Sequence, residues 1–132
     1  MALLRRSLYL DALLAELSGL AFLAVPRFVV TTLLAQPSYP DYAWVRLLGV
    51  ALIALGLLMV LVAHRIEELW WWSWAFVILE AGTGFVLVLH AAFGLPAGAA
   101  PWAWGVMAAR SWAFAFGLLG GLARAGAERP VA

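Results

Sequence analysis

The chain has 132 residues, of which 67% are hydrophobic and only 11% are charged, and its formal net charge is +1. Soluble domains are about half apolar and about a quarter charged, so this chain lacks the polar residues that would cover a water-facing surface. The small net charge gives no reason to propose nucleic acid as a partner. The absence of cysteine excludes disulfides, thiolate metal sites and cysteine nucleophiles. The composition therefore predicts an integral membrane protein.

The first 25 residues contain two arginines followed by an apolar run, which superficially resembles a signal peptide. Asp11 and Glu16 interrupt the apolar run, and no convincing cleavage site follows it. We therefore expect a retained first helix.

Four segments are apolar over the roughly 20 residues that a helix needs to cross a bilayer. They are residues 8–25, 42–63, 70–93 and 101–123. Each of the last three segments is preceded by a connecting stretch: AQPSYPDY, HRIEEL and GLPAGAAP, in chain order. The prolines, charges and glycines of these stretches are typical of turns and loops. We expect an all-α fold in which residues 1–132 form one membrane domain, a polytopic bundle of four transmembrane helices.

Residues 26–35, PRFVVTTLLA, fit two interpretations. They either extend the first span or form a short helix that lies in the membrane interface. The interfacial helix is favoured, because an extension would place Arg27 inside the membrane. In the interfacial helix, Arg27 and the two threonines would face the headgroups, whereas Val29 and its apolar neighbours would face the lipid.

The placement of arginines predicts the orientation. One side of a four-span topology carries Arg5, Arg6, Arg65, Arg124 and Arg129, and the other carries Arg27 and Arg46. Since the cytoplasmic side of a membrane protein is the richer in arginine, both termini are expected in the cytoplasm of a bacterium, with the chain in the inner (cytoplasmic) membrane. The tryptophans of WWWSW then mark the inner boundary and Trp102 and Trp104 mark the outer one.

Three ionisable residues interrupt the apolar spans: Glu16 in the first, Glu80 in the third and Arg110 in the fourth. With a rise of about 1.5 Å per residue, they lie within roughly 6 Å of one another in depth, near the bilayer centre. Each would cost about 2.5 to 3.5 kcal/mol if it faced lipid alone. We therefore predict an intramembrane cluster in which Arg110 pairs with Glu80, with Glu16 as the second candidate.

Two interpretations of this cluster stay open. As a structural ion pair, it would fix how the helices pack. As a binding site, it would hold two carboxylates that share one arginine, so that one carboxylate tends to keep a proton. Such a site would bind a polar headgroup or relay a proton.

Arg46 and His90 are the candidate polar residues of the outer side. We expect His90 to bond a loop carbonyl, or Arg46 to share the outer environment with Asp41. His64 and His90 lie at opposite faces of the membrane, so they cannot hold one metal ion or haem together. The sequence thus predicts no metal site and no cofactor, and it identifies no catalytic residue.

Glycines recur at helical spacing in two spans. Gly49 and Gly56 lie on the second span, and Gly117 and Gly121 form a G-x-x-x-G on the fourth. Small residues at this spacing let helix backbones approach closely, and G-x-x-x-G is typical of a face through which copies of a helix associate.

The stretch WVRLLGVALIALGLLMVLVAHR opens a span with Arg46 and follows it with Gly49 and Gly56. A proline-led apolar segment, FLAVPRFVVTTLLA, precedes it. Over residues 8–64 this pattern resembles small bacterial four-helix membrane proteins of the DoxX-like kind. The resemblance implies the same four-helix membrane fold, and some proteins of that kind are accessory subunits linked with quinone oxidation or redox complexes. Glu80 and Arg110 match no pattern of that group.

Three functions are compatible with the sequence. The favoured one is a non-enzymatic subunit or scaffold, which would join a homo-oligomer or a larger membrane complex through its glycine-rich faces. The second is a protein that binds a lipid, a quinone or another apolar small molecule, and it predicts a cavity at the level of Glu16, Glu80 and Arg110. The third is an intramembrane enzyme that uses a carboxylate acid/base pair. Membrane lipids are expected partners in each case.

Overall fold

The computed structural model describes residues 1–128, and in that range it contains helices and no strand. Its four long helices are α1 (Ala2–Ala24), α3 (Ala43–His64), α5 (Ser73–Phe93) and α6 (Pro101–Glu128). Each is long and apolar enough to cross a membrane, α5 together with the helical turns that precede it. The predicted all-α fold with four long apolar helices is therefore confirmed.

Short helical turns connect the long helices. The turns α2 (Pro26–Phe28) and η1 (Val29–Leu33), the latter a π-helix, follow α1. The turns α4 (Ile66–Leu69) and η2 (Trp70–Trp72), the latter a 3-10 helix, lie between α3 and α5. The HRIEEL stretch is therefore largely helical rather than the loop we expected. Its two glutamates lie in the first turn of α4, where the positive end of a helix favours acidic side chains.

Two long helices exceed their predicted ranges. α1 begins at Ala2 rather than at residue 8, and α6 runs past residue 123 to Glu128. The added turns contain arginines, which are good helix formers and continue a helix beyond an apolar run. Arg129, which entered the predicted orientation, lies outside the described residues.

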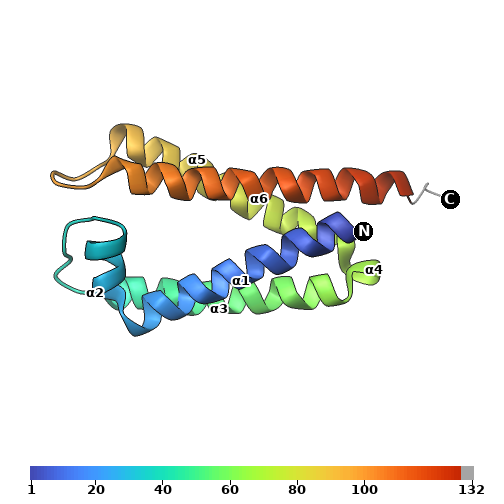
Figure 1. Ribbon diagram of the computed structural model, residues 1–132, viewed down its shortest axis with the longest axis horizontal. Coiled ribbons are helices and arrows are strands. Elements are labelled where there is room, and N and C mark those ends of the chain that lie inside the picture. The colour runs from blue at the N-terminus through green and yellow to red at the C-terminus, as the bar shows by residue number, and fades with distance from the viewer. Residues whose placement is uncertain (129–132) are drawn as a thin grey trace.

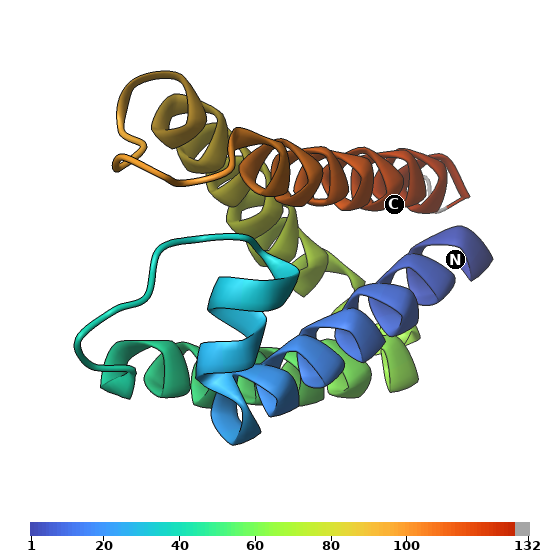
Figure 2. The same cartoon turned by 60° about the vertical axis from the view of Figure 1, so that its left-hand side comes forward.

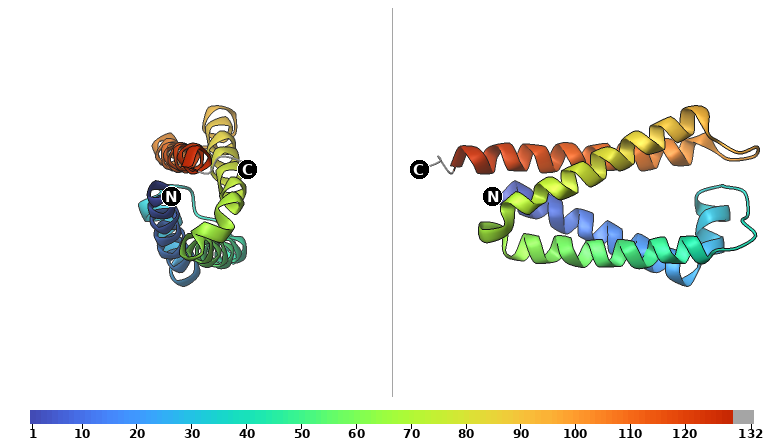
Figure 3. Two further views of the ribbon diagram at one scale, coloured as in Figure 1. Left: turned by 90° about the vertical axis from the view of Figure 1, so that its right-hand side faces the viewer. Right: turned by 180° about the vertical axis from the view of Figure 1, so that it is seen from behind.

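The four long helices form two pairs. α1 packs along α3, α5 packs along α6, and α1 also contacts α6 (Figure 1). The start of α1 and the end of α6 lie at one end of the bundle, here called the termini end. The helices α3 and α5 come together near this end and diverge toward the opposite end, as Figure 2 and Figure 3 show. The bundle is therefore closed at the termini end and splayed at the opposite end.

The hydrophobic core lies at the termini end, where all four long helices contribute to it. Its buried members are Leu4, Leu8, Ala12, Met59, Val62, Ala63, Ile66, Phe76, Val77, Leu118 and Leu122. Close packing of such side chains stabilises the association of helices. The core therefore fixes the two helix pairs to each other at this end.

Glycines bring helix backbones into contact within the chain. A Cβ atom on Gly19 would lie 2.7 Å from the carbonyl oxygen of Gly49, so α1 and α3 touch there. A Cβ atom on Gly121 would lie 2.8 Å from Leu4 Cα, and one on Gly117 would meet α1 at 3.3 Å. The G-x-x-x-G face of α6, expected to be free for self-association, is therefore occupied by α1 of the same chain.

The segment after α1 turns away from the helix axis. Val25 leaves the helical conformation, with φ of −132° and ψ of 53°, and Pro26 begins α2 in its first turn. The turns α2 and η1 then cross the opposite end of the bundle between the two helix pairs (Figure 2). An extended first span is therefore excluded. Val29, expected to face lipid, is instead buried, because one side of η1 faces the interior of the bundle.

Candidate functional site

Arg110 of α6, Asp11 of α1 and Glu80 of α5 form a polar cluster inside the bundle. Arg110 Nη2 donates a 2.7 Å hydrogen bond to Asp11 Oδ1 and lies 3.9 Å from Glu80 Oε1. Asp11 is 0% exposed and Glu80 is 5% exposed, whereas the Arg110 side chain is 34% exposed. The predicted contact of Arg110 with Glu80 is present, but the second carboxylate at the guanidinium is Asp11 and not Glu16.

Glu16, however, is not a member of this cluster. Its Cγ lies 2.6 Å from where a Cβ atom on Gly56 would be, so Glu16 packs against α3. Asp11 occupies the position that we predicted for Glu16. Residues five positions apart in a helix point about 140° apart around its axis, so the two carboxylates cannot both face α6.

Several polar atoms in and around the cluster lack a hydrogen-bond partner within residues 1–128. They are Asp11 Oδ2, Glu80 Oε2, Arg110 Nε and Ser111 Oγ, together with Glu16 Oε1 and Ser73 Oγ farther away. Buried polar groups are normally paired, and an unpaired one costs about 1–3 kcal/mol. The cluster therefore has hydrogen-bonding capacity that the chain itself leaves unused.

A cavity of about 500 Å³ adjoins the cluster, between the two helix pairs. Arg110 is the one charged residue among its described lining residues, and Ser18, Thr83 and Ser111 supply hydroxyl groups. A second cavity, of about 210 Å³, continues it toward the opposite end. The residues common to both linings are Phe22, Leu34, Leu48, Leu87 and Met107. Together the two cavities form one largely apolar space, here called the chamber, with Arg110 in its wall.

Gln36 lines the chamber at the opposite end, a position that we did not predict. Its Nε2 donates to the carbonyl oxygens of Leu34, at 2.7 Å, and Ala100, at 3.1 Å. Its Oε1 accepts a 2.9 Å hydrogen bond from Trp104 Nε1. Ala35, directly before it, has a φ of +50°, which marks the sharp turn that ends η1. Gln36 thus joins the segment after η1 to the start of α6.

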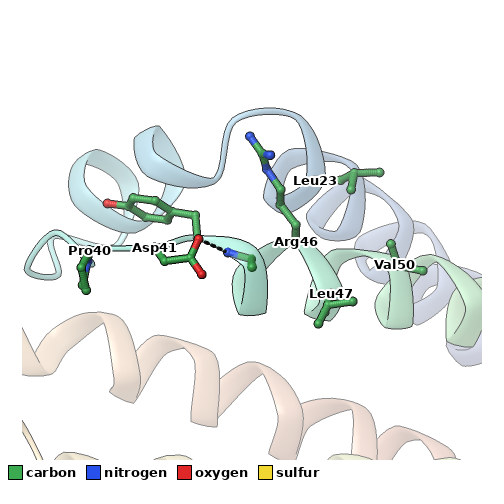
Figure 4. A pocket seen from close by; sticks show the side chains of 8 residues that line it. Leu23, Pro40, Asp41, Arg46, Leu47 and Val50 are labelled. Carbon is green, nitrogen blue, oxygen red and sulfur yellow. Dashed lines mark hydrogen bonds between the residues drawn. The ribbon is translucent and has the colours of Figure 1, made fainter.

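Arg46 and His90 also lie at the opposite end, but apart from the polar cluster. The His90 ring packs on Trp104 with 4.4 Å between ring centroids, and within residues 1–128 its side chain has no hydrogen bond to a loop carbonyl. Arg46 and Asp41 line the same surface groove, as expected (Figure 4). No ion pair joins those two residues in the described range.

Neither a relative nor a metal centre identifies the site. Within residues 1–128, no three histidine or acidic side chains are placed to hold a metal ion. Comparison of the chain with protein-family models, curated proteins and solved structures found no match. The resemblance of residues 8–64 to DoxX-like proteins therefore stays a prediction, and the function has to be argued from the geometry.

Proposed function

We propose that this chain is a four-span membrane protein with both termini in the cytoplasm, and that it binds a lipid-like molecule in the chamber. The observation that carries the proposal is the chamber itself. Its lining has Arg110 and Ser111 at one end, Gln36 and Tyr39 at the opposite end, and mainly apolar side chains between them, with Ser18 and Thr83 as further hydroxyl groups. Binding sites for small amphiphiles have this character, with apolar walls and a few polar groups that fix the head.

The end at Arg110 favours a neutral head that accepts hydrogen bonds. Asp11 and Glu80 already offer two carboxylates to the single guanidinium of Arg110, so a third anionic group would be unfavourable there. Arg110 and Ser111 are donors with unused capacity. A carbonyl or hydroxyl oxygen, as in a quinone or a long-chain alcohol, matches this arrangement, and the apolar tail would extend toward Gln36.

The structure gives less support to the two other functions. A docking subunit was favoured because of the glycine faces, but those of α1, α3 and α6 are occupied within the chain. An acid/base enzyme needs a carboxylate within hydrogen-bond reach of its substrate. Asp11 and Glu80 are buried and are not among the residues that line the cavity at Arg110.

Native mass spectrometry of the protein, extracted gently from its own membranes, tests the proposal. A reproducible added mass in the lipid range is expected for the unmodified chain. Leu52→Trp, which fills the cavity, should remove it. Leu57→Trp, on the same helix but 60% exposed and outside the lining, should keep it. An added mass that persists in Leu52→Trp would contradict binding in the chamber, and a reproducible protein partner without a small molecule would favour the subunit instead.

A matched serine pair tests the position of the head. Ser73 and Ser111 both carry a buried hydroxyl without a partner within residues 1–128, but only Ser111 lines the cavity. Ser111→Ala should weaken retention of the ligand about tenfold, the effect of losing about 1.4 kcal/mol. Ser73→Ala should leave retention unchanged. Equal retention by both variants would contradict a head placed beside Arg110.

A further inference from the structure

A groove distinct from the chamber lies on the outer side of the α2–η1 segment, and it shares Tyr42 and Arg46 with the groove of Figure 4. It has a volume of about 540 Å³, and its lining includes Arg27 from α2 and Arg46 from α3. Thr32 of η1 and Tyr42, just before α3, add two hydroxyl groups. Val29 lies on the other side of η1, and it lines the chamber together with later residues of that same side. The groove and the chamber are therefore different sites with η1 between them.

Both arginines of the groove are free to bind an anion. The ion pairs of the described residues involve neither Arg27 nor Arg46. Asp41, which lines the groove of Figure 4 together with Arg46, accepts a 3.0 Å hydrogen bond from the Ala43 backbone N–H through its Oδ1. Figure 4 shows the Arg46 side chain extending away from the Asp41 carboxylate. Two guanidinium groups from different elements thus border one groove without a partner of opposite charge.

Apolar side chains lie beside these charges. Phe28, which is 52% exposed, and Val25 belong to the groove lining, and the exposed Trp44 lies in the first turn of α3. Exposed aromatic and apolar side chains next to arginine are typical of the level where lipid headgroups meet acyl chains. A soluble anion would use only the arginines, whereas a phospholipid would use the apolar residues as well.

We propose that this groove binds the phosphate of a phospholipid with a net negative headgroup, with Arg27 and Arg46 as its ligands and the Thr32 and Tyr42 hydroxyls as further donors. Guanidinium groups bind phosphate oxygens through paired, charge-assisted hydrogen bonds, which makes two arginines a strong phosphate site. The inference rests on the proposed membrane insertion but not on ligand binding in the chamber. A headgroup in this place would hold the α2–η1 segment at the outer surface.

The test uses the purified full chain in nanodiscs of phosphatidylcholine with a minor fraction of phosphatidylglycerol. Incorporation into pure phosphatidylcholine discs is checked first, because its failure would contradict membrane insertion rather than the groove. Retained phosphatidylglycerol is then counted by native mass spectrometry. The combined Arg27→Gln and Arg46→Gln variant should retain it at least about tenfold less well than the unmodified chain. Arg46→Lys should be intermediate, because lysine keeps the charge but not the paired geometry.

The control is Arg6→Gln, which removes an exposed arginine at the termini end that forms no described ion pair. It should retain phosphatidylglycerol normally. Equal retention by the double variant and this control would overturn the proposal. Inorganic phosphate, compared with sodium chloride at matched ionic strength, separates the two sources of phosphate. Displacement of the lipid by inorganic phosphate alone would overturn the choice of a phospholipid and assign the groove to free phosphate, whereas retention of the lipid supports the proposal.

Discussion

Arg110 donates a 2.7 Å hydrogen bond to Asp11, a residue 99 positions earlier in the chain. The bond joins α6 to α1 next to the hydrophobic core of the termini end. Ala12 and Leu118 are buried in that core. Toward the opposite end the two helix pairs diverge and the chamber begins. The pair therefore lies at the boundary between the packed half of the bundle and the hollow half, which makes it both a packing contact and a part of the site.

Removal of Asp11 should destabilise the fold. Asp11→Ala leaves the Arg110 guanidinium with the 3.9 Å contact to Glu80 and its position over the Phe114 ring. Breaking a fully buried ion pair costs about 3–5 kcal/mol, and the cost here should be smaller because the Arg110 side chain is 34% exposed. Glu80→Gln should cost less, because the shorter bond to Asp11 stays. Thermal unfolding of the detergent-solubilised protein measures both. If the Asp11→Ala variant had the same melting temperature as the unmodified chain, the pair would contribute nothing to stability.

A double variant separates the structural role of the pair from its binding role. In Asp11→Leu with Arg110→Met, made in a Glu80→Gln background because Glu80 also pairs with Arg110, no charge of the cluster is left unpaired, so the melting temperature should return to that of Glu80→Gln alone or exceed it. Ligand retention in the chamber should still be lost, because Arg110 is the charged residue of its lining. If the double variant retained the ligand, Arg110 would be only a packing residue.

The error over Glu16 has a geometric origin. A first helix that starts at residue 8 has its middle near Glu16, whereas the observed start at Ala2 moves the middle toward Asp11. The prediction rested on depth in the membrane and not on helical phase. Asp11 follows Leu4 and Leu8 at steps of four and three, which is the spacing of one helix face. This spacing can be read from the sequence, and it indicates that Asp11 is the residue of the first helix that faces the core.

Other features were beyond what the sequence alone predicts. The four long helices were predictable because each apolar run is long and bounded by turn residues. The chamber results from the angle between two helix pairs, which no local pattern encodes. Gln36 bonds Ala100 and Trp104, which lie 64 and 68 positions later in the chain, so its role depends on tertiary contacts.

The glycines of α6 should differ sharply in their tolerance of alanine. In Gly121→Ala the new methyl group would lie 2.8 Å from Leu4 Cα, a backbone atom that cannot move alone, and such overpacking costs about 1–3 kcal/mol. Gly105→Ala meets nothing within 4 Å and gains up to about 1 kcal/mol of helix propensity. The melting temperature should therefore fall in Gly121→Ala and stay the same or rise in Gly105→Ala. A Gly121→Ala variant that melts normally but changes oligomer mass would restore the self-association interpretation.

Single cysteines should reveal the proposed orientation, because the chain has no cysteine of its own. Ser38→Cys lies in the exposed connection at the opposite end, and Glu68→Cys lies in the exposed turn between α3 and α5. In intact cells a membrane-impermeant maleimide should label Ser38→Cys, and it should label Glu68→Cys only after permeabilisation. The reverse pattern would place the termini outside, and labelling of both positions in intact cells would contradict the four-span topology.

Loss of the Gln36 side chain should widen the chamber at the opposite end of the bundle. Gln36→Leu removes three hydrogen bonds and leaves Trp104 Nε1 without its acceptor. A loss of about 1.4 kcal/mol in the free energy of local opening raises the open population about tenfold. A single cysteine at Met107, which lines both cavities, should then react with a maleimide about tenfold faster.

Two controls make this result specific to Gln36. Ser38→Ala changes an exposed residue of the same connection and should leave the reaction rate at position 107 unchanged. A cysteine at Leu118, which is buried in the core of the termini end, reports unfolding of the whole bundle. Faster labelling at 107 but not at 118 would place the opening at Gln36. Equal acceleration at both positions would mean that Gln36 stabilises the entire fold, and the chamber would then have no separate opening at that end.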